Sequence, residues 1–169
     1  MLQNLRNYIL IFCFLIISGC KNSAQTQIPS EYRFENQIGY VNDYDDLLTL
    51  EQENNLEKIL SDYDLKTTNE IGVVTVKSIK PYTDINQFGD DVLTDWRFGK
   101  DDKFNGLLII IDGKERMISI RFGTGIMKTL SNEKTQHILD DIITKRFKEG
   151  RFYEGITDGI EHIATELKD

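Results

Sequence analysis

A run of five apolar residues, from Leu107 to Ile111, constrains the fold of this chain more than any other sequence feature. The run is short, contains β-branched residues and is followed by the turn signal Asp112-Gly113, which is typical of a β-strand. Its apolar residues are continuous rather than alternating, as in strands that are buried on both faces of a sheet. We therefore predict that residues 107–111 form the central strand of a sheet with helices on both faces.

Capping and periodic patterns predict the elements around this strand. Thr49-x-x-Gln52 has the form of a capping box and precedes a helical apolar period. The expected order is a helix at about 50–63, a strand at 70–76, a helix beginning after Asp84, a hairpin of strands 107–111 and 116–122, a helix between Ser131 and Gly150, and a last helix near 156–167. Trp96 continues the apolar stripe of the second helix, so we expect its side chain to be buried. This order predicts an α/β fold, namely a three-layer α/β/α sandwich with a small mixed sheet and helices on both faces.

The first twenty residues have the features of a secretion signal. Arg6 provides a positive charge, and residues 8–17 form an apolar run that is too short for a transmembrane helix, which needs about 20 residues. The sequence Ile17-Ser18-Gly19-Cys20 resembles a bacterial lipobox, in which the cysteine is acylated and becomes the mature N-terminus. The alternative is an ordinary signal peptide with a coincidental cysteine. We expect a signal peptide over 1–19, a lipid such as palmitate on Cys20, and a domain attached to a membrane of the bacterial cell envelope, on its periplasmic or extracytoplasmic side.

Composition and charge narrow the possible functions. The chain has 169 residues, of which 40% are hydrophobic and 28% charged, and this suits one globular domain. Loss of residues 1–19 removes Arg6 and no acidic residue, so the net charge changes from −8 to −9, which argues against a nucleic-acid partner. Cys13 leaves with the signal and Cys20 carries the lipid, so the mature chain has neither a free thiol nor a disulfide. We expect a polar tether over 20–40 and a monomeric domain over 41–169.

Two loops are expected to meet at one edge of the sheet. Strands 70–76 and 107–111 are joined through a helix and should be parallel, whereas the hairpin partner of the second strand runs the other way. The loop 99–105, which enters the central strand, therefore lies beside the loop 122–130, which leaves its partner.

The first of these loops carries candidate ligands for a metal ion. Asp101, Asp102 and Asn105 offer oxygen atoms of the kind that Ca²⁺ or Mg²⁺ prefers. The alternative is a solvated turn flanked by Lys100 and Lys103. The loop alone does not distinguish these two possibilities.

Other candidate residues lie outside this loop. Asp43 could complete the cation site, or it could form a turn or stabilise the start of a helix. The glycine pair of Gly123-Thr124-Gly125, with Arg116 nearby, could hold a phosphate. A tight turn with a surface arginine is the alternative for that loop.

Several short motifs, taken in order, resemble the TPM domain family. They are Val41-Asn42-Asp43, Leu47-Leu48-Thr49, EIGVVTV at 70–76, Trp96-x-x-Gly99, Asn105-Gly106-Leu107-Leu108, Arg116, Gly123-x-Gly125 and Phe147-x-x-Gly150-x-Phe152-x-x-Gly155-Ile156. The resemblance covers nearly all of residues 41–167. It implies a secreted or membrane-attached α/β/α sandwich. Some family members are described as acid phosphatases or divalent-cation binders, and thylakoid relatives are linked to photosystem II repair.

The chain departs from the family pattern at three positions. Phe104 stands where the family usually has an acidic residue before the Asn-Gly pair, Thr124 where it has an aromatic residue, and Asn132 where it has an aspartate. Each departure removes a feature on which the transfer of a family metal site would depend.

Two functional hypotheses follow. The sequence contains no G-x-S-x-G elbow, P-loop or H-E-x-x-H motif. The first hypothesis is a membrane-anchored interaction module for the assembly or repair of membrane proteins, with a membrane-protein partner and a cation that orders its loops. The second is a weak metal-dependent acid phosphatase, in which Asp43 and Asp102 hold the metal and Arg116 stabilises phosphate charge. The small number of catalytic features favours the first hypothesis.

Overall fold

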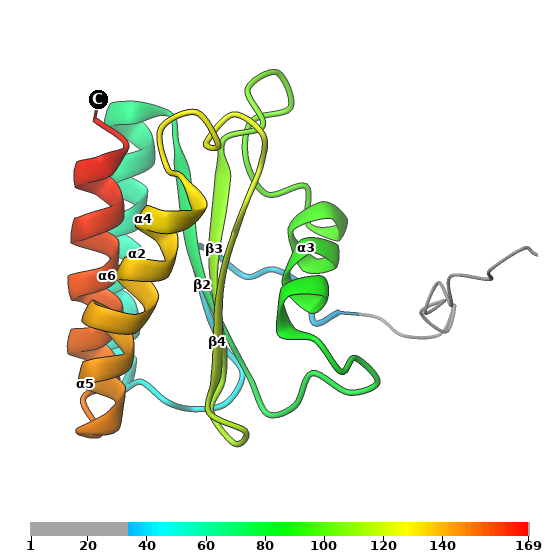
Figure 1. The fold of residues 1–169 in the computed structure, drawn as a ribbon, viewed down its shortest axis with the longest axis vertical. Coiled ribbons are helices and arrows are strands. Elements are labelled where there is room, and N and C mark those ends of the chain that lie inside the picture. Colours follow the sequence, from blue (N-terminus) through cyan, green and yellow to red (C-terminus); the bar gives the residue numbers. More distant parts are fainter. Residues whose placement is uncertain (1–33, 169) are drawn as a thin grey trace, which may run out of the picture. The chain divides into compact units, whose positions relative to one another are not determined.

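Strand β3, Gly106–Asp112, is an inner strand of a four-stranded sheet with the order β1-β2-β3-β4 (Figure 1). The computed structural model describes residues 34–168 of the chain. The other strands are β1 (Val41–Asp43), β2 (Glu70–Val76) and β4 (Met117–Phe122). Strands β1, β2 and β3 are parallel, and β4 runs antiparallel to β3. The predicted mixed sheet and the predicted hairpin are therefore present.

The central position of β3 follows from its composition. All seven residues of this strand are buried, which confirms the prediction of a strand covered on both faces. Ile109 pairs with Val73 of β2 and with Ile120 of β4. Because full burial of one such side chain stabilises a fold by about 1.5–3 kcal/mol, this run contributes a large share of the apolar stabilisation.

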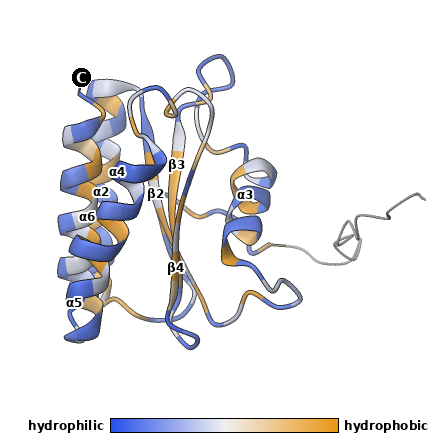
Figure 2. Ribbon diagram, viewed as in Figure 1, coloured by the Kyte–Doolittle hydropathy of each residue, from blue (hydrophilic) through white to orange (hydrophobic). Residues whose placement is uncertain are grey.

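Helices cover both faces of the sheet, as predicted. Helix α3 (Ile85–Asp95) lies on one face, and the other face carries α2 (Leu50–Thr67), α4 (Asn132–His137), α5 (Thr144–Lys148) and α6 (Phe152–Glu166) (Figure 1). A π-helical turn, η1 (Ile138–Ile143), joins α4 to α5. The apolar sides of the helices face the sheet, and their polar sides face outward (Figure 2). The protein is thus the expected three-layer α/β/α sandwich.

The predicted helix starts are confirmed by their caps. The side chain of Thr49 accepts a hydrogen bond from the Gln52 backbone N–H, and the Gln52 side chain accepts one from the Thr49 N–H, which completes the capping box. Asp84 caps α3 and Ser131 caps α4 in the same side-chain-to-backbone manner. Gly150, with a φ of 73°, follows α5 and ends the third predicted helix.

Two elements differ from the prediction. Helix α2 ends at Thr67 rather than near residue 63, and Thr68, with a φ of 66°, terminates it. The additional turn contains Leu65, which is 80% exposed, so no apolar period marks this turn in the sequence. Strand β1 was not expected, because three residues are too few to form an alternating pattern.

Residues 34–40, which the sequence analysis assigns to the tether, contact the domain. The ring of Phe34 lies edge-on to that of Phe88, with 5.5 Å between the ring centroids. The Trp96 indole N–H donates to the Glu35 carbonyl oxygen at 3.0 Å. The prediction that Trp96 is buried was therefore wrong, because its side chain extends from the end of α3 over this segment and stays half-exposed.

The predicted signal peptide, the lipidated Cys20 and the first part of the tether lie outside the described residues. Between residues 34 and 168, no helix combines the length and the apolar content that a membrane crossing requires. The folded unit includes residues 34–40 in addition to the range predicted to fold.

Candidate functional site

The two loops that were expected to meet do so at the edge of the sheet where β2 and β3 begin and β4 ends. We call this the amino edge and define it as residues 97–105 and 123–131. The Gly123 N–H donates to the Gly106 carbonyl oxygen at 2.9 Å, and the Gly125 N–H donates to the Phe104 carbonyl oxygen at 2.9 Å. The two loops are therefore joined through their main chains.

Close main-chain contact explains the two glycines of the second loop. A Cβ atom on Gly123 would lie against the Phe104 carbonyl oxygen, and one on Gly125 would lie against the Lys103 carbonyl oxygen, far inside van der Waals contact. Glycine allows such an approach because it has no side chain. The space that the sequence analysis assigned to a phosphate is thus filled by protein backbone. Thr124, between the glycines, is exposed.

Arg116 does not lie near this glycine pair. It belongs to the hairpin turn after β3, where its backbone has a φ of 55°, and its side chain is exposed. The full length of β4, about 20 Å for six residues, separates it from Gly123. The predicted grouping of an arginine with the glycine loop was wrong, because the two ends of β4 lie at opposite edges of the sheet.

The side chain of Asn105 is committed to structure. It is only 5% exposed, and its oxygen accepts a hydrogen bond from the Lys100 N–H at 3.0 Å. Its amide nitrogen donates to the Thr68 carbonyl oxygen at 2.7 Å and to the Asn69 side-chain oxygen at 3.0 Å. Asn105 therefore ties the end of α2 to the loop that enters β3 and is not free to bind a cation.

Asp43 lies at the opposite edge. Its partner in β2 is Thr75, which in turn pairs with Ile111 near the end of β3, about 16 Å along the strand from the amino edge. The Asp43 carboxylate accepts hydrogen bonds from the N–H groups of Leu47 at 3.1 Å and Leu48 at 2.7 Å, and from the Thr75 hydroxyl. It organises the turn before α2, which is the alternative that the sequence analysis gave.

The predicted four-residue cation site is therefore not assembled. Asp101 and Asp102 are exposed at the amino edge, Asn105 is saturated by protein hydrogen bonds, and Asp43 is at the other end of the sheet. In the part of the chain that the structure describes, no group of three or more His, Cys, Asp or Glu side chains is placed to hold a metal ion.

A polar network at the amino edge was missed in the sequence. The Lys100 ammonium bonds to the carboxylates of Asp64, at 3.0 Å, and Glu70. A second Glu70 oxygen accepts from the Gly99 N–H at 2.7 Å, and the Tyr40 hydroxyl donates to Asp64 at 2.7 Å. These residues come from the assumed tether, the unpredicted last turn of α2, β2 and the loop, so no local pattern could have grouped them.

The network changes two pKa values in the same direction. Hydrogen bonds to Glu70 and Asp64 raise the pKa of Lys100 above its ordinary value, against an opposing effect of burial. Burial, followed by the hydrogen bond to Asp64, raises the pKa of Tyr40 to about 12. The lysine thus stays charged and offsets one of the two negative charges of Asp64 and Glu70.

Apolar side chains are exposed at the same edge. Phe104 is 61% exposed and Met127 is 58% exposed, and they belong to the two loops that the glycine contacts join. Phe104 has a left-handed backbone with a φ of 49°.

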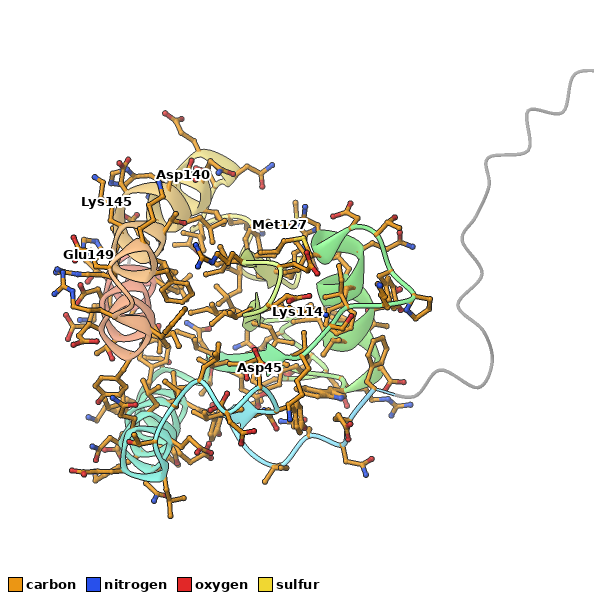
Figure 3. All side chains as sticks on the ribbon, turned by 90° about the horizontal axis from the view of Figure 1, so that it is seen from below. Asp45, Lys114, Met127, Asp140, Lys145 and Glu149 are labelled. Atoms are coloured by element: carbon orange, nitrogen blue, oxygen red, sulfur yellow. The ribbon has the colours of Figure 1, made fainter. Side chains whose placement is uncertain are left out.

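The other end of the sheet serves as a comparison for the amino edge. We call it the carboxyl edge and define it as residues 44–50 and 113–116. Figure 3 views the protein from this end, and Asp45 and Lys114 are labelled there.

Comparison with known proteins identifies the family. The model of the TPM domain matches residues 41–166. The chain belongs to the TPM domain family. This match includes all four strands of the sheet and all the helices described above, but not the docked residues 34–40. No curated protein matches the chain.

Three solved structures are similar to this chain. The N-terminal domain of a protein from P. gingivalis is 25% identical, with a TM-score of 0.69, over 76% of this chain and 82% of that chain. The BA42 protein from the psychrophilic bacterium Bizionia argentinensis is 26% identical, with a TM-score of 0.64, over 73% and 83%. The N-terminal domain of a Corynebacterium glutamicum protein, at 15% identity and a TM-score of 0.60 over 82% and 83%, shows the fold alone.

Substitution of Gly125 by Ala tests the main-chain contact between the loops. The added methyl group should push residues 123–125 away from Lys103 and lower the free energy of unfolding by about 1–3 kcal/mol. Urea denaturation measures this change. Thr124→Ala, at the exposed position between the glycines, is the matched control and should change stability by no more than about 0.5 kcal/mol. Equal stability of Gly125→Ala and wild type would contradict the contact.

Alkaline pH tests the polar network. The folded-state pKa of Tyr40 is about 12 against an ordinary value of 10.0, and that of Lys100 is also raised, so the folded protein binds protons more tightly than the unfolded chain. Their contribution is complete below about pH 10 and should be lost as the pH rises toward 12. Tyr40→Phe should make this loss less steep in urea titrations at stepped pH. An unchanged slope would show that the pKa of Tyr40 is not raised in the folded protein.

Proposed function

We propose that this TPM domain protein is a lipoprotein of the bacterial cell envelope, anchored through Cys20, and that it acts at the surface of its membrane as an interaction module in the assembly or repair of membrane proteins. The observation that carries this proposal is the amino edge, which exposes Phe104 and Met127 on two loops held together by main-chain hydrogen bonds. Large exposed apolar side chains on a fixed frame are typical of a contact surface.

Preorganisation makes this edge suited to binding. Asn105, the Lys100 network and the glycine contacts hold the two loops before any partner arrives. A surface that is already ordered loses little conformational entropy on binding, so its contacts are not offset by the free energy of ordering a loop. The amino edge can therefore bind through few side chains.

A cation has a smaller part in this proposal than the sequence analysis gave it. Of the four predicted ligands, Asp101 and Asp102 are the two with exposed carboxylates at the amino edge. A Ca²⁺ or Mg²⁺ ion held there would have two protein residues and water as ligands, which corresponds to the weak range of about 10⁻⁴–10⁻³ M. The two metal ligands of the phosphatase hypothesis, Asp43 and Asp102, lie at opposite edges of the sheet, so we do not propose that activity.

Replacement of Cys20 by Ser tests the anchor. The variant should lose fatty-acid labelling and should leave the membrane fraction after an alkaline carbonate wash, whereas the wild type should stay bound. The wash is needed because a protein with a membrane-binding surface can stay on the membrane without its lipid. Absence of fatty-acid label on the wild-type chain would contradict the anchor.

Photo-crosslinking in cells tests the contact surface. A photoreactive amino acid in place of Phe104 or Met127 should crosslink to components of the membrane. The same amino acid in place of Leu50, which is 73% exposed and lies at the carboxyl edge, is the matched control and should not crosslink. Equal crosslinking from residues 50 and 104 would show that the amino edge is not a specific contact surface.

A further inference from the structure

We propose that the amino edge lies directly against the bilayer to which the chain is anchored. In this arrangement Phe104 and Met127 enter the interfacial region of the lipid, and Lys103 and Lys128 contact the phosphate groups of lipid headgroups. This inference rests on the proposed membrane anchor and specifies what the proposed contact surface touches.

The backbone keeps both apolar side chains outside the protein core. The carbonyl oxygen of Phe104 accepts a hydrogen bond from the Gly125 N–H, its backbone has a left-handed φ of 49°, and its side chain is 61% exposed. Ile126, the neighbour of Met127, is 2% exposed and belongs to the core, so it anchors the second loop. Burial of these apolar surfaces therefore requires contact with another apolar phase.

Charge complements the apolar side chains. Each exposed apolar residue has a lysine beside it in the sequence, Lys103 before Phe104 and Lys128 after Met127. Lys103 donates to the Thr68 hydroxyl at 2.7 Å, and neither lysine forms an ion pair within residues 34–168. A lysine next to an exposed apolar residue is the combination that interfacial membrane contacts use.

Neighbouring carboxylates set the strength of this attraction. Asp64 and Glu70 both form ion pairs with Lys100, which offsets one of their two negative charges and so reduces their repulsion toward anionic lipid. Asp101 and Asp102 stay exposed on the same loop and weaken the attraction. Insertion of the apolar side chains is therefore required, and charge alone does not bind this edge to a membrane.

The size of the surface favours a bilayer over a protein partner. A stable protein interface buries about 800 Å² on each partner, whereas the amino edge, as defined above, offers two large exposed apolar side chains, Phe104 and Met127. Two projecting apolar side chains with adjacent lysines suit the interfacial region of a bilayer, whose lipids can rearrange around them. Residues 21–33 allow a distance of up to about 45 Å between the lipid and the docked segment, so the edge can reach the membrane.

Flotation with lipid vesicles tests this inference on the mature chain carrying Cys20→Ser, which has no lipid of its own. It should float with vesicles of phosphatidylethanolamine and phosphatidylglycerol, and bind vesicles of phosphatidylcholine alone more weakly. Phe104→Asp and Met127→Ser should each weaken binding by about fivefold or more. Lys103→Gln and Lys128→Gln should each weaken binding to the anionic vesicles by about fivefold.

Matched controls separate this effect from a general loss of hydrophobicity or charge. Leu50→Asp and Lys114→Gln make the same kinds of change, from an exposed apolar residue to aspartate and from lysine to glutamine, at the carboxyl edge and should bind vesicles as the parent does. Phe104→Asp should remain folded, because aspartate tolerates a left-handed backbone better than phenylalanine. Circular dichroism of each variant verifies this.

The possible outcomes distinguish the two proposals. If the parent does not bind vesicles, or if Leu50→Asp weakens binding as much as Phe104→Asp, contact with the bilayer is overturned. If residue 104 crosslinks to a protein in cells while vesicles are not bound, the partner at this edge is a protein, and the proposed interaction module still stands. Absence of fatty-acid label on the wild-type chain would overturn the proposed lipoprotein without affecting vesicle binding by the Cys20→Ser chain.

Discussion

The buried amide of Asn105 is the interaction on which the amino edge depends. It is hydrogen-bonded to Lys100, Thr68 and Asn69, and so connects the loop before β3 to the end of α2 and the start of β2. Each of these bonds contributes about 1 kcal/mol, and removal of the amide would leave buried polar groups without partners at larger cost. Because these bonds hold the loop before β3, the Phe104 carbonyl oxygen is in place to accept the hydrogen bond from the Gly125 N–H.

Local patterns were sufficient to predict most of the fold. The apolar run of β3, the β-branched residues of β2 and the capping box at Thr49 each act over a few residues, so their signals are present in the sequence itself. The meeting of the two amino-edge loops could be predicted from the strand directions alone. Because β4 runs antiparallel to β3, the loop that enters β3 and the loop that leaves β4 must lie at the same edge of the sheet. The alternative given for Gly123 and Gly125 was a tight turn, and the main-chain contact that these glycines make with the other loop was not predicted.

The composition of the site could not be predicted in the same way. Asp43 was assigned to the wrong edge. Strand β1 is too short to be recognised from the sequence, and its pairing with β2 places Asp43 at the edge where these strands end. The bonds of Lys100 to Asp64 and Glu70 join polar residues that are about 30 positions or more apart, and no periodicity relates them. Polar contacts between distant segments depend on the assembled fold, whereas apolar periodicity reflects the local element.

The central claim is that the amino edge is a rigid surface that exists before any partner binds. Backbone ¹⁵N relaxation of the free, unlipidated chain measures this rigidity residue by residue. The account predicts order parameters near about 0.85 for residues 99–105 and 123–127, equal to those of β2 and β3. Order parameters below about 0.6 in these two loops would show that the edge is flexible when free, and they would contradict the account.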